Sequence, residues 1–90
     1  MYAIVDIETT GGYADNHRIT EVAIYHHDGM QITDHFQTLI NPGRRIPQFI
    51  TGLTGITNEM VEEAPIFEDV AEEIYEWLKD RVFVAHNAHF

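Results

Sequence analysis

Short apolar and alternating runs occupy the first half of the chain and have the spacing of strands. Residues 1–7 are apolar apart from one acid, which favours a strand buried on both faces. Residues 19–27 alternate, and residues 30–40 follow them after Asp28-Gly29, a dipeptide typical of a hairpin turn. Asn41-Pro42-Gly43 then ends the third run. This half therefore predicts a meander of three antiparallel strands, with core residues on the third at Phe36, Leu39 and Ile40.

Helical spacing replaces the alternation further along the chain. From Phe67 to Leu78, apolar residues recur at every third or fourth position, opposite a face of acids. We predict an amphipathic helix whose apolar stripe packs on the sheet, with Trp77 as a core anchor. The apolar run 82–85 then predicts a fourth strand, and a strand that follows a crossover helix usually lies parallel to its partner. The predicted fold class is α/β, a mixed sheet with a helix packed on it.

The connection between the third strand and this helix has no clean periodicity. Pro47 can open a short helical turn that includes Phe49 and Ile50. Thr57 is a residue type that caps helices, so a second short helix is expected over residues 58–63, with acids in its first turn. Pro65 breaks that helix. Two short helical segments are therefore expected before the long one.

Two acids, Asp6 and Glu8, stand inside the first strand and at its end. Because side chains two positions apart leave a strand on the same face, both carboxylates are predicted to point the same way, about 7 Å apart along the strand. An ionised carboxylate in an apolar run is costly unless a positive charge offsets it, and no basic residue lies nearby in the sequence. These residues favour a site for a hard divalent cation. The alternative is a strand end whose two acids already face solvent.

The strand ends in Thr9-Thr10-Gly11-Gly12, which is small, polar and flexible, so a substrate backbone could approach closely there. The rest of the composition limits the class of protein. No cysteine is present, which excludes disulfides and thiolate metal sites. We expect that the start of the chain is not a signal peptide, and no apolar run approaches the roughly 20 residues that a membrane helix needs, so we expect a cytoplasmic protein. The net charge of −10 excludes binding of nucleic acid by phosphate neutralisation alone.

Three separated segments resemble one family, the DEDD-type (DEDDh-like) 3′–5′ exonucleases. The chain is similar in particular to the proofreading epsilon subunit of bacterial replicative DNA polymerase. The first segment, Val5–Gly11, looks like the motif whose Asp and Glu bind the catalytic metals. The second, Leu53–Val61 followed by Ala64-Pro65, looks like the border of the pocket for the terminal nucleotide. The third, Val84–Phe90, looks like the start of the second motif, and Leu39–Pro42 matches between them.

The resemblance implies a ribonuclease-H-like fold and a two-metal site for Mg²⁺ or Mn²⁺, which suits ligands that are all oxygen. Two such ions about 4 Å apart would activate a water and stabilise the leaving 3′ oxygen. Asp6 and Glu8 would be the metal-binding and catalytic residues, with Glu8 also orienting the water. The implied substrate-binding residues are Thr9, Thr10 and Gly11 as donors, Leu53 and Thr54 beside the base or sugar, Asn87 near the scissile phosphate, and Phe90 as wall or core.

The resemblance covers residues 1–90, but only about the first half of a family domain. The family's third acid follows the position of Phe90, and a later motif supplies a general-base histidine and a fourth acid. His86 and His89 cannot replace that histidine, because both belong to the second motif. We therefore expect the 90-residue chain to be inactive alone, and to self-associate through strand 82–85 and the stripe around Trp77. The implied partners are a DNA 3′ end, with RNA possible, and a polymerase subunit or fused domain; the alternative is a non-catalytic fragment or interaction module.

Overall fold

A computed structural model describes residues 1–11 and 17–86, with the side chain of His86 left out. It contains strands β1 (Tyr2–Thr9), β2 (Ile19–His27), β3 (Ile32–Leu39) and β4 (Val82–His86). Helices α1 (Gln48–Thr54), α2 (Asn58–Glu62) and α3 (Phe67–Leu78) lie between β3 and β4. None of these helices is long and apolar enough to cross a membrane.

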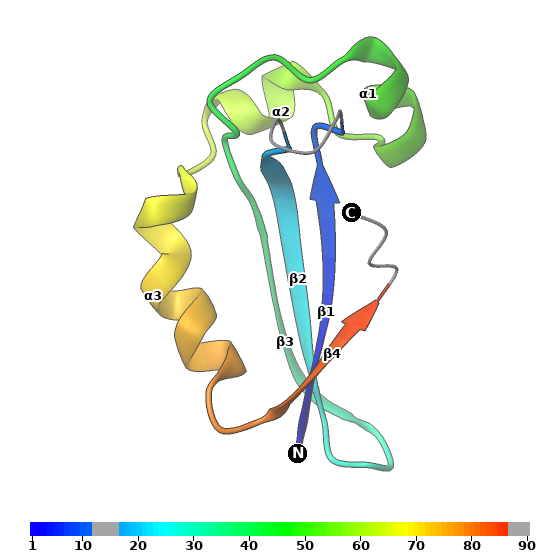
Figure 1. Ribbon diagram of the computed structural model, residues 1–90, viewed down its shortest axis with the longest axis vertical. Helices are drawn as coiled ribbons and strands as arrows, with labels where there is room; N and C mark the ends of the chain where they lie inside the picture. The colour runs from blue at the N-terminus through cyan, green and yellow to red at the C-terminus, as the bar shows by residue number, and fades with distance from the viewer. Residues whose placement is uncertain (12–16, 87–90) are drawn as a thin grey trace.

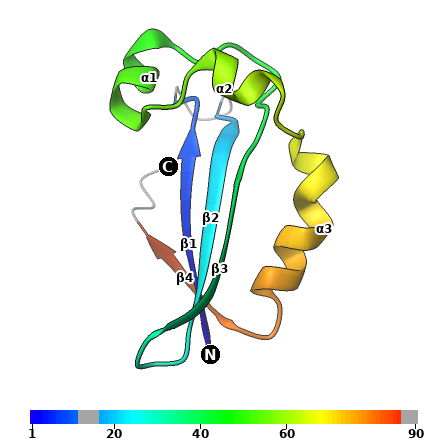
Figure 2. The same cartoon turned by 180° about the vertical axis from the view of Figure 1, so that it is seen from behind.

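The four strands form one mixed sheet in the order β3-β2-β1-β4. β1 pairs antiparallel with β2, β2 pairs antiparallel with β3, and β4 pairs parallel with β1. Figure 1 shows α3 running beside the sheet and returning the chain to β4, while α1 and α2 lie beyond the tip of β1. The view from behind shows the same arrangement (Figure 2). The predicted meander, crossover helix and parallel fourth strand are confirmed.

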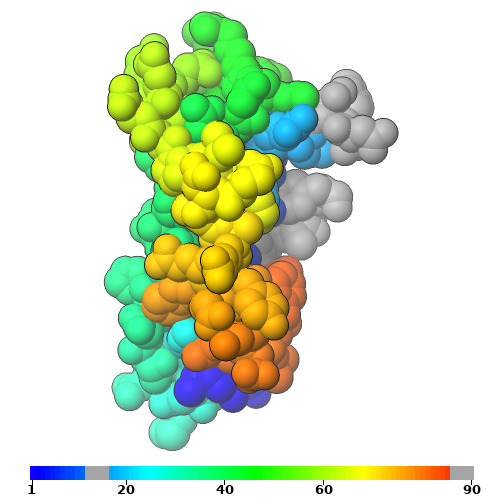
Figure 3. Space-filling view, turned by 90° about the vertical axis from the view of Figure 1, so that its left-hand side faces the viewer, coloured from blue at the N-terminus to red at the C-terminus, as the bar shows by residue number. Residues whose placement is uncertain are grey.

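α3 packs on one face of the sheet and closes the main core. The buried residues there are Ala3, Val22, Ile24, Ile40 and Ile74. Figure 3, viewed from this side, shows α3 lying across the molecule in yellow and orange. Since side chains alternate along a strand, the opposite face of β1 is less covered: Tyr2 is exposed and Ile4 is half-buried. The prediction that β1 is buried on both faces is therefore wrong in the described part of the chain.

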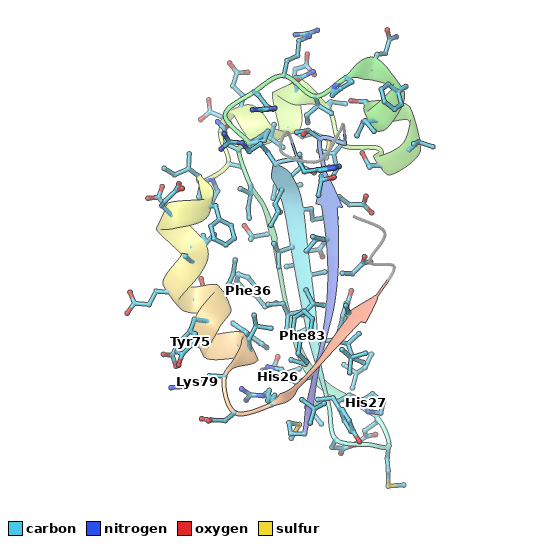
Figure 4. All side chains as sticks on the ribbon, in the orientation of Figure 1. His26, His27, Phe36, Tyr75, Lys79 and Phe83 are labelled. Carbon is cyan, nitrogen blue, oxygen red and sulfur yellow. The ribbon has the colours of Figure 1, made fainter. Side chains whose placement is uncertain are left out.

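Trp77 packs between α3 and the sheet, which confirms its predicted role as a core anchor. Its ring lies 4.5 Å from that of His26 and 5.6 Å from that of Phe36, between ring centres. The Nε2 atom of His26 lies 2.7 Å from the carbonyl oxygen of Trp77. Because a carbonyl only accepts, Nε2 carries the proton and donates it to the last turn of α3. Figure 4 shows His26 and Phe36 on the sheet side of α3. The stripe around Trp77 is thus covered by the chain itself and is not free for self-association.

Two element bounds differ from those predicted, and both have local causes. β3 begins at Ile32 instead of Met30, because the side chain of Asp28 accepts hydrogen bonds from the backbone N–H groups of Met30 (2.8 Å) and Gln31 (2.9 Å). This turn takes up residues that alternation alone assigns to the strand. α2 ends at Glu62, one residue early. Its predicted cap is confirmed, since the backbone N–H of Met60 donates to the hydroxyl of Thr57 over 3.2 Å.

Candidate active site

Asp6 and Glu8 lie on the sheet face opposite α3. The neighbouring positions on β1, Val5 and Ile7, pack against the core under α3, so the alternation places both acids on the other side. The pairing of β1 with β2 sets Asp6 opposite Ala23 and Glu8 opposite Glu21. Both acidic side chains are half-buried. The predicted common face for the two carboxylates is therefore confirmed, and they stand near the C-terminal end of β1.

Glu8 sits in a field that disfavours its charge. Its pKa is raised above the ordinary value, first by partial burial, then by the negative charges of Asp6 and Glu21. None of these causes is a positively charged side chain. A cation bound at this place would reverse the effect, because opposite charge stabilises the ionised carboxylate. The electrostatics of Glu8 thus fit a metal ligand better than a solvated surface acid.

Glu21 is the third acid of this face, and the sequence reasoning did not include it. It is the direct cross-strand neighbour of Glu8, and its Oε2 accepts a hydrogen bond of 2.7 Å from the amide of Gln37 on β3. Like charges directly opposite each other are unfavourable in a sheet. The register that creates this pair depends on the β1–β2 connection. The sequence offered one signal for this role, since Glu21 lies on the more polar face of the alternating run 19–27.

The donor set suits a hard cation but is incomplete among the described residues. Asp6 and Glu8 offer only carboxylate oxygens, which Mg²⁺ and Mn²⁺ prefer. Within residues 1–11 and 17–86, no three histidine, aspartate or glutamate side chains are placed to hold a metal ion together. The two carboxylates fit one side of a metal site. Further ligands would have to come from outside the described residues.

The turn after Glu8 is held by its own hydrogen bonds. The backbone N–H of Gly11 donates to the hydroxyl of Thr9 over 3.1 Å. Thr10 is buried, and its hydroxyl accepts from the backbone N–H of Arg18 over 3.3 Å while donating to the carbonyl of Gly11 over 3.3 Å. Thr10 therefore fixes the turn against β2, while its role as a donor to substrate stays a prediction. Thr9 and Gly11 remain partly exposed.

Gly11 also explains why α1 lies beside this turn. Its φ of 69° is in the left-handed region that favours glycine. A Cβ atom at Gly11 would stand 2.5 Å from the Cδ1 atom of Ile50, which lies on α1. Ile50 in turn packs on a second small core formed by Ile46, Ile56 and Val61. The close approach of Gly11 to Ile50 thus holds α1 beside the turn that follows β1, and Figure 1 shows α1 beyond the tip of that strand.

The two residues predicted to border a terminal nucleotide behave differently. Leu53 is 79% exposed at the end of α1 and is available for contact. The hydroxyl of Thr54 donates to the carbonyl of Ile50 over 3.0 Å and accepts from the backbone N–H of Ile56 over 3.1 Å. Thr54 therefore mainly stabilises the end of the helix, while the role of Leu53 stays a prediction. Asn87 and Phe90 lie outside the described residues.

Asn58 is a structural residue that the sequence reasoning missed. Its side-chain oxygen accepts from the backbone N–H of Ile46 over 2.8 Å, and its amide donates to the carbonyl of the same residue over 3.2 Å. This pair of bonds ties the start of α2 to the segment before α1. The short helices are thus fixed to each other as well as to the sheet. Only the three-dimensional pairing reveals this role, since an asparagine after a capping threonine is unremarkable in sequence.

β4 brings the third segment of the resemblance to the same place. The parallel register of β1 and β4 sets the backbone of His86 level with Asp6. All three separated segments thus converge on the C-terminal end of β1: Asp6 and Glu8 on the strand itself, α1 next to the turn, and the end of β4 alongside.

Comparisons with known proteins agree with this arrangement. The family model "Exonuclease" (RNase_T) matches residues 3–90. The 3′–5′ exonuclease DinG of Staphylococcus haemolyticus is 45% identical over 89 residues, which is 99% of this chain and 10% of that protein. DinG of Staphylococcus aureus strain MRSA252 is also 45% identical over the same shares. The chain thus spans about a tenth of the length of these curated relatives.

Solved structures share the fold. Exonuclease X, in complex with 5′-overhanging duplex DNA, has a TM-score of 0.83 and is 32% identical, over 100% of this chain and 51% of that chain. The nuclease domain of 3′hExo, described as a DEDDh family member bound to rAMP, has a TM-score of 0.66 over 92% of this chain at 22% identity, a likeness of fold alone. The ribonuclease-H-like fold is therefore confirmed. By the match of the family model over residues 3–90, the chain belongs to the exonuclease (RNase_T) family.

Proposed function

We propose that this chain is the N-terminal part of a metal-dependent exonuclease domain that hydrolyses phosphodiester bonds and removes nucleotides from nucleic-acid 3′ ends. The observation that carries the proposal is the pair of half-buried carboxylates of Asp6 and Glu8 on one face of β1. The pKa of Glu8 is raised by burial and by negative charges, and a bound cation would offset both effects. Membership of an exonuclease family supports the same reading.

In this proposal Asp6 and Glu8 hold Mg²⁺ or Mn²⁺ in a two-metal site. When bound, such ions lower the pKa of a bound water and stabilise charge on the leaving oxygen. The chain's own residues then do three things. Glu8 orients the attacking water. Thr9 and the open turn at Gly11 let the terminal nucleotide approach closely. Leu53, exposed on α1, contacts its base.

The remaining catalytic groups would come from residues that follow this chain. A third acid, a general-base histidine and a fourth acid complete the site that the resemblance implies. The match to DinG over a tenth of its length favours a domain inside a longer polypeptide over a separate polymerase subunit. Exonuclease X, the more similar of the two structures above, carries DNA, so we propose a DNA 3′ end as substrate, in proofreading or repair. A non-catalytic module that keeps only the fold is the competing proposal.

The test uses the full-length protein and a DNA strand labelled near its 5′ end, incubated with Mg²⁺. Asp6→Asn and Glu8→Gln should each lower release of the 3′ nucleotide about a thousand-fold, since a metal site supplies several kcal/mol and each 1.36 kcal/mol is tenfold. EDTA should stop release altogether. Glu73→Gln, on the exposed side of α3, is the matched control and should leave the rate unchanged.

Two results would contradict the proposal. Equal digestion by the Asp6→Asn protein and the unchanged protein would place the chemistry elsewhere. Metal-dependent digestion by the 90-residue chain alone, if abolished by Asp6→Asn, would show that the later residues are dispensable. We expect no digestion by the 90-residue chain. If the full-length protein is folded and keeps Asp6 and Glu8 but is inactive, the non-catalytic module is favoured.

A further inference from the structure

The few basic residues of the chain are unevenly placed. There are five Lys and Arg side chains, against a net charge of −10. Lys79 and Arg81 lie at the end of the sheet where β1 begins, since the backbone N–H of Val82 donates to the carbonyl of Met1 over 3.0 Å. Lys79 is paired there with Glu76 at 2.8 Å, and Arg81 donates to the carbonyls of Glu76 and Lys79. Both cations are thus used within the fold.

The other three cations lie at the end of the sheet that carries the carboxylates. The backbone N–H of Arg18 donates to the turn that follows β1. Arg44 and Arg45 directly precede Ile46, which packs in the second core together with Ile50 of α1. Figure 1 shows α1 and α2 beyond the tip of β1. Positive charge is therefore concentrated at the end where we place cleavage, and an anionic strand is favoured there over the opposite end.

Arg45 is exposed and is attached to a fixed piece of backbone. The next residue, Ile46, is buried, and its backbone N–H and carbonyl are both bonded to the side chain of Asn58, over 2.8 Å and 3.2 Å. Within residues 1–11 and 17–86, Arg45 makes no ion pair with an acid. The base of this side chain is therefore held in place, while its charge remains available to a ligand.

A hollow of about 540 Å³ opens beside Arg45, between the starts of α1 and α2. Neutral donors line it, namely Gln48 and Thr51 on α1 and Thr57 at the cap of α2. The hydroxyl oxygen of Thr57 accepts from the backbone of α2, which leaves its proton for another acceptor. Glu59 also lines the hollow and opposes an anion. One guanidinium with several neutral donors suits a single backbone phosphate, because Arg, Thr and Gln are among the usual donors to phosphate oxygens.

The hollow is within reach of a strand whose 3′ end lies at the carboxylates. Arg45 precedes Ile50 by five residues, so at most about 17 Å separates them. Ile50 lies against Gly11, which follows Glu8 by three residues and so by at most about 11 Å. The whole path is no longer than about 35 Å, which a stacked strand covers in about ten nucleotides at 3.4 Å each. We propose that Arg45 and this hollow bind a backbone phosphate of the substrate strand, within about ten nucleotides of its 3′ end.

This inference rests on the proposed exonuclease function and adds a contact for the part of the strand that is not being cleaved. The experiment measures the affinity of the full-length Asp6→Asn protein for single-stranded DNA in Mg²⁺, by fluorescence anisotropy of a label at the 5′ end. The strands range from two to twenty nucleotides. Affinity should rise with length up to about ten nucleotides, where the strand reaches Arg45, and then level off.

Arg45→Ala, made in the same protein, should remove part of that gain. Binding of a strand of twelve nucleotides should weaken about three- to five-fold, the size expected of one exposed ion pair, while a strand of two nucleotides should bind as before. The slope of log affinity against log salt should fall by about 0.7, the value for one phosphate contact on a single strand. Arg45→Lys, which keeps the charge, should keep that slope.

Two further variants serve as matched controls. Lys79→Ala removes an exposed cation at the opposite end of the sheet, so it should alter neither the length dependence nor the salt slope. Glu59→Gln removes the acid that opposes an anion in the hollow, so it should strengthen binding of the longer strand by about two-fold. The tryptophan fluorescence of each variant confirms that the fold is kept.

Two outcomes would overturn the inference and spare the exonuclease proposal. In one, Arg45→Ala binds twelve nucleotides as tightly as before with the same salt slope, and the hollow serves a partner other than nucleic acid. In the other, strands of two and twelve nucleotides weaken equally, so that Arg45 acts at the 3′ end or on the fold. If instead the Asp6→Asn protein shortens the labelled strand during the measurement, the exonuclease proposal fails, and the affinities still decide whether Arg45 contacts the strand.

Discussion

The two faces of the sheet follow different rules. The face under α3 is closed by apolar side chains such as Val22 and Ile24, with Trp77 packed against them. The opposite face holds Asp6, Glu8 and Glu21, three acids within one pair of strands. The first arrangement lowers the free energy of the fold, whereas the second raises it through like charges at close range. This cluster of like charges lies on the face where we propose the metal site.

Shortening an apolar side chain on the covered face should have the largest effect. Ile24 is fully buried, so Ile24→Ala is expected to lower the free energy of unfolding by about 2–5 kcal/mol through lost transfer energy and a cavity. Ile4→Ala, on the half-buried opposite face, should cost clearly less. Urea denaturation of the 90-residue chain measures both. Equal losses would show that the two faces are equally covered in solution.

A change at the turn between the faces comes next. Gly11→Ala should cost about 1–2 kcal/mol for a side chain in the left-handed region, and more because the new Cβ meets Ile50. Gly55→Ala is the matched control, since Gly55 has a similar φ of 80° with nothing within 4 Å of the added atom. Denaturation curves compare the two variants. A Gly11→Ala loss no greater than that of Gly55→Ala would mean that Ile50 moves aside freely.

The smallest effect concerns charge on the open face. The pKa of Glu8 is raised by burial and by two acids, so the folded chain binds more protons than the unfolded chain just above pH 4.5. Stability is therefore lost as pH rises through that window. Glu21→Gln should lower the pKa of Glu8 and raise stability at pH 7 by about 0.2–1 kcal/mol.

The pH dependence supplies the check on this variant. Carbon NMR of the Glu8 carboxyl follows its pKa directly, and urea denaturation at pH 4 and pH 7 follows stability. The advantage of Glu21→Gln should shrink at the lower pH, where Glu8 becomes protonated in both proteins. Glu73→Gln, on the solvent side of α3, should show no such trend. If the pKa of Glu8 stays the same after Glu21→Gln, the charge of Glu21 does not affect Glu8.

Most of the covered face was predictable from the sequence because it depends on local periodicity. Alternation located the strands, and helical spacing located α3 and its core anchor Trp77. Asp6 and Glu8 were placed correctly on a common face by the two-residue repeat of a strand alone. The bounds of β3 were missed because the side chain of Asp28 organises a longer turn than Asp-Gly suggests.

The rest of the site depends on contacts between distant residues, which no local pattern contains. Glu21 meets Glu8 only through the register of β1 and β2, and Asn58 holds Ile46 across twelve positions. Phe49 was recognised as part of a helical turn, but its exposure follows from Ile50 taking the inward position. Metal binding by Asp6 and Glu8 and substrate contact by Leu53 stay predictions, as do those at Asn87 and Phe90.

The packing of Trp77 against His26 has a practical consequence for experiments. The chain has a single tryptophan, and it lies between α3 and the sheet, away from the acids of the other face. Its fluorescence is therefore an optical reporter of whether α3 remains docked. If metal or an oligonucleotide binds at the carboxylate face while α3 stays docked, this fluorescence should stay constant. A change in the signal would instead report that α3 has moved away from the sheet.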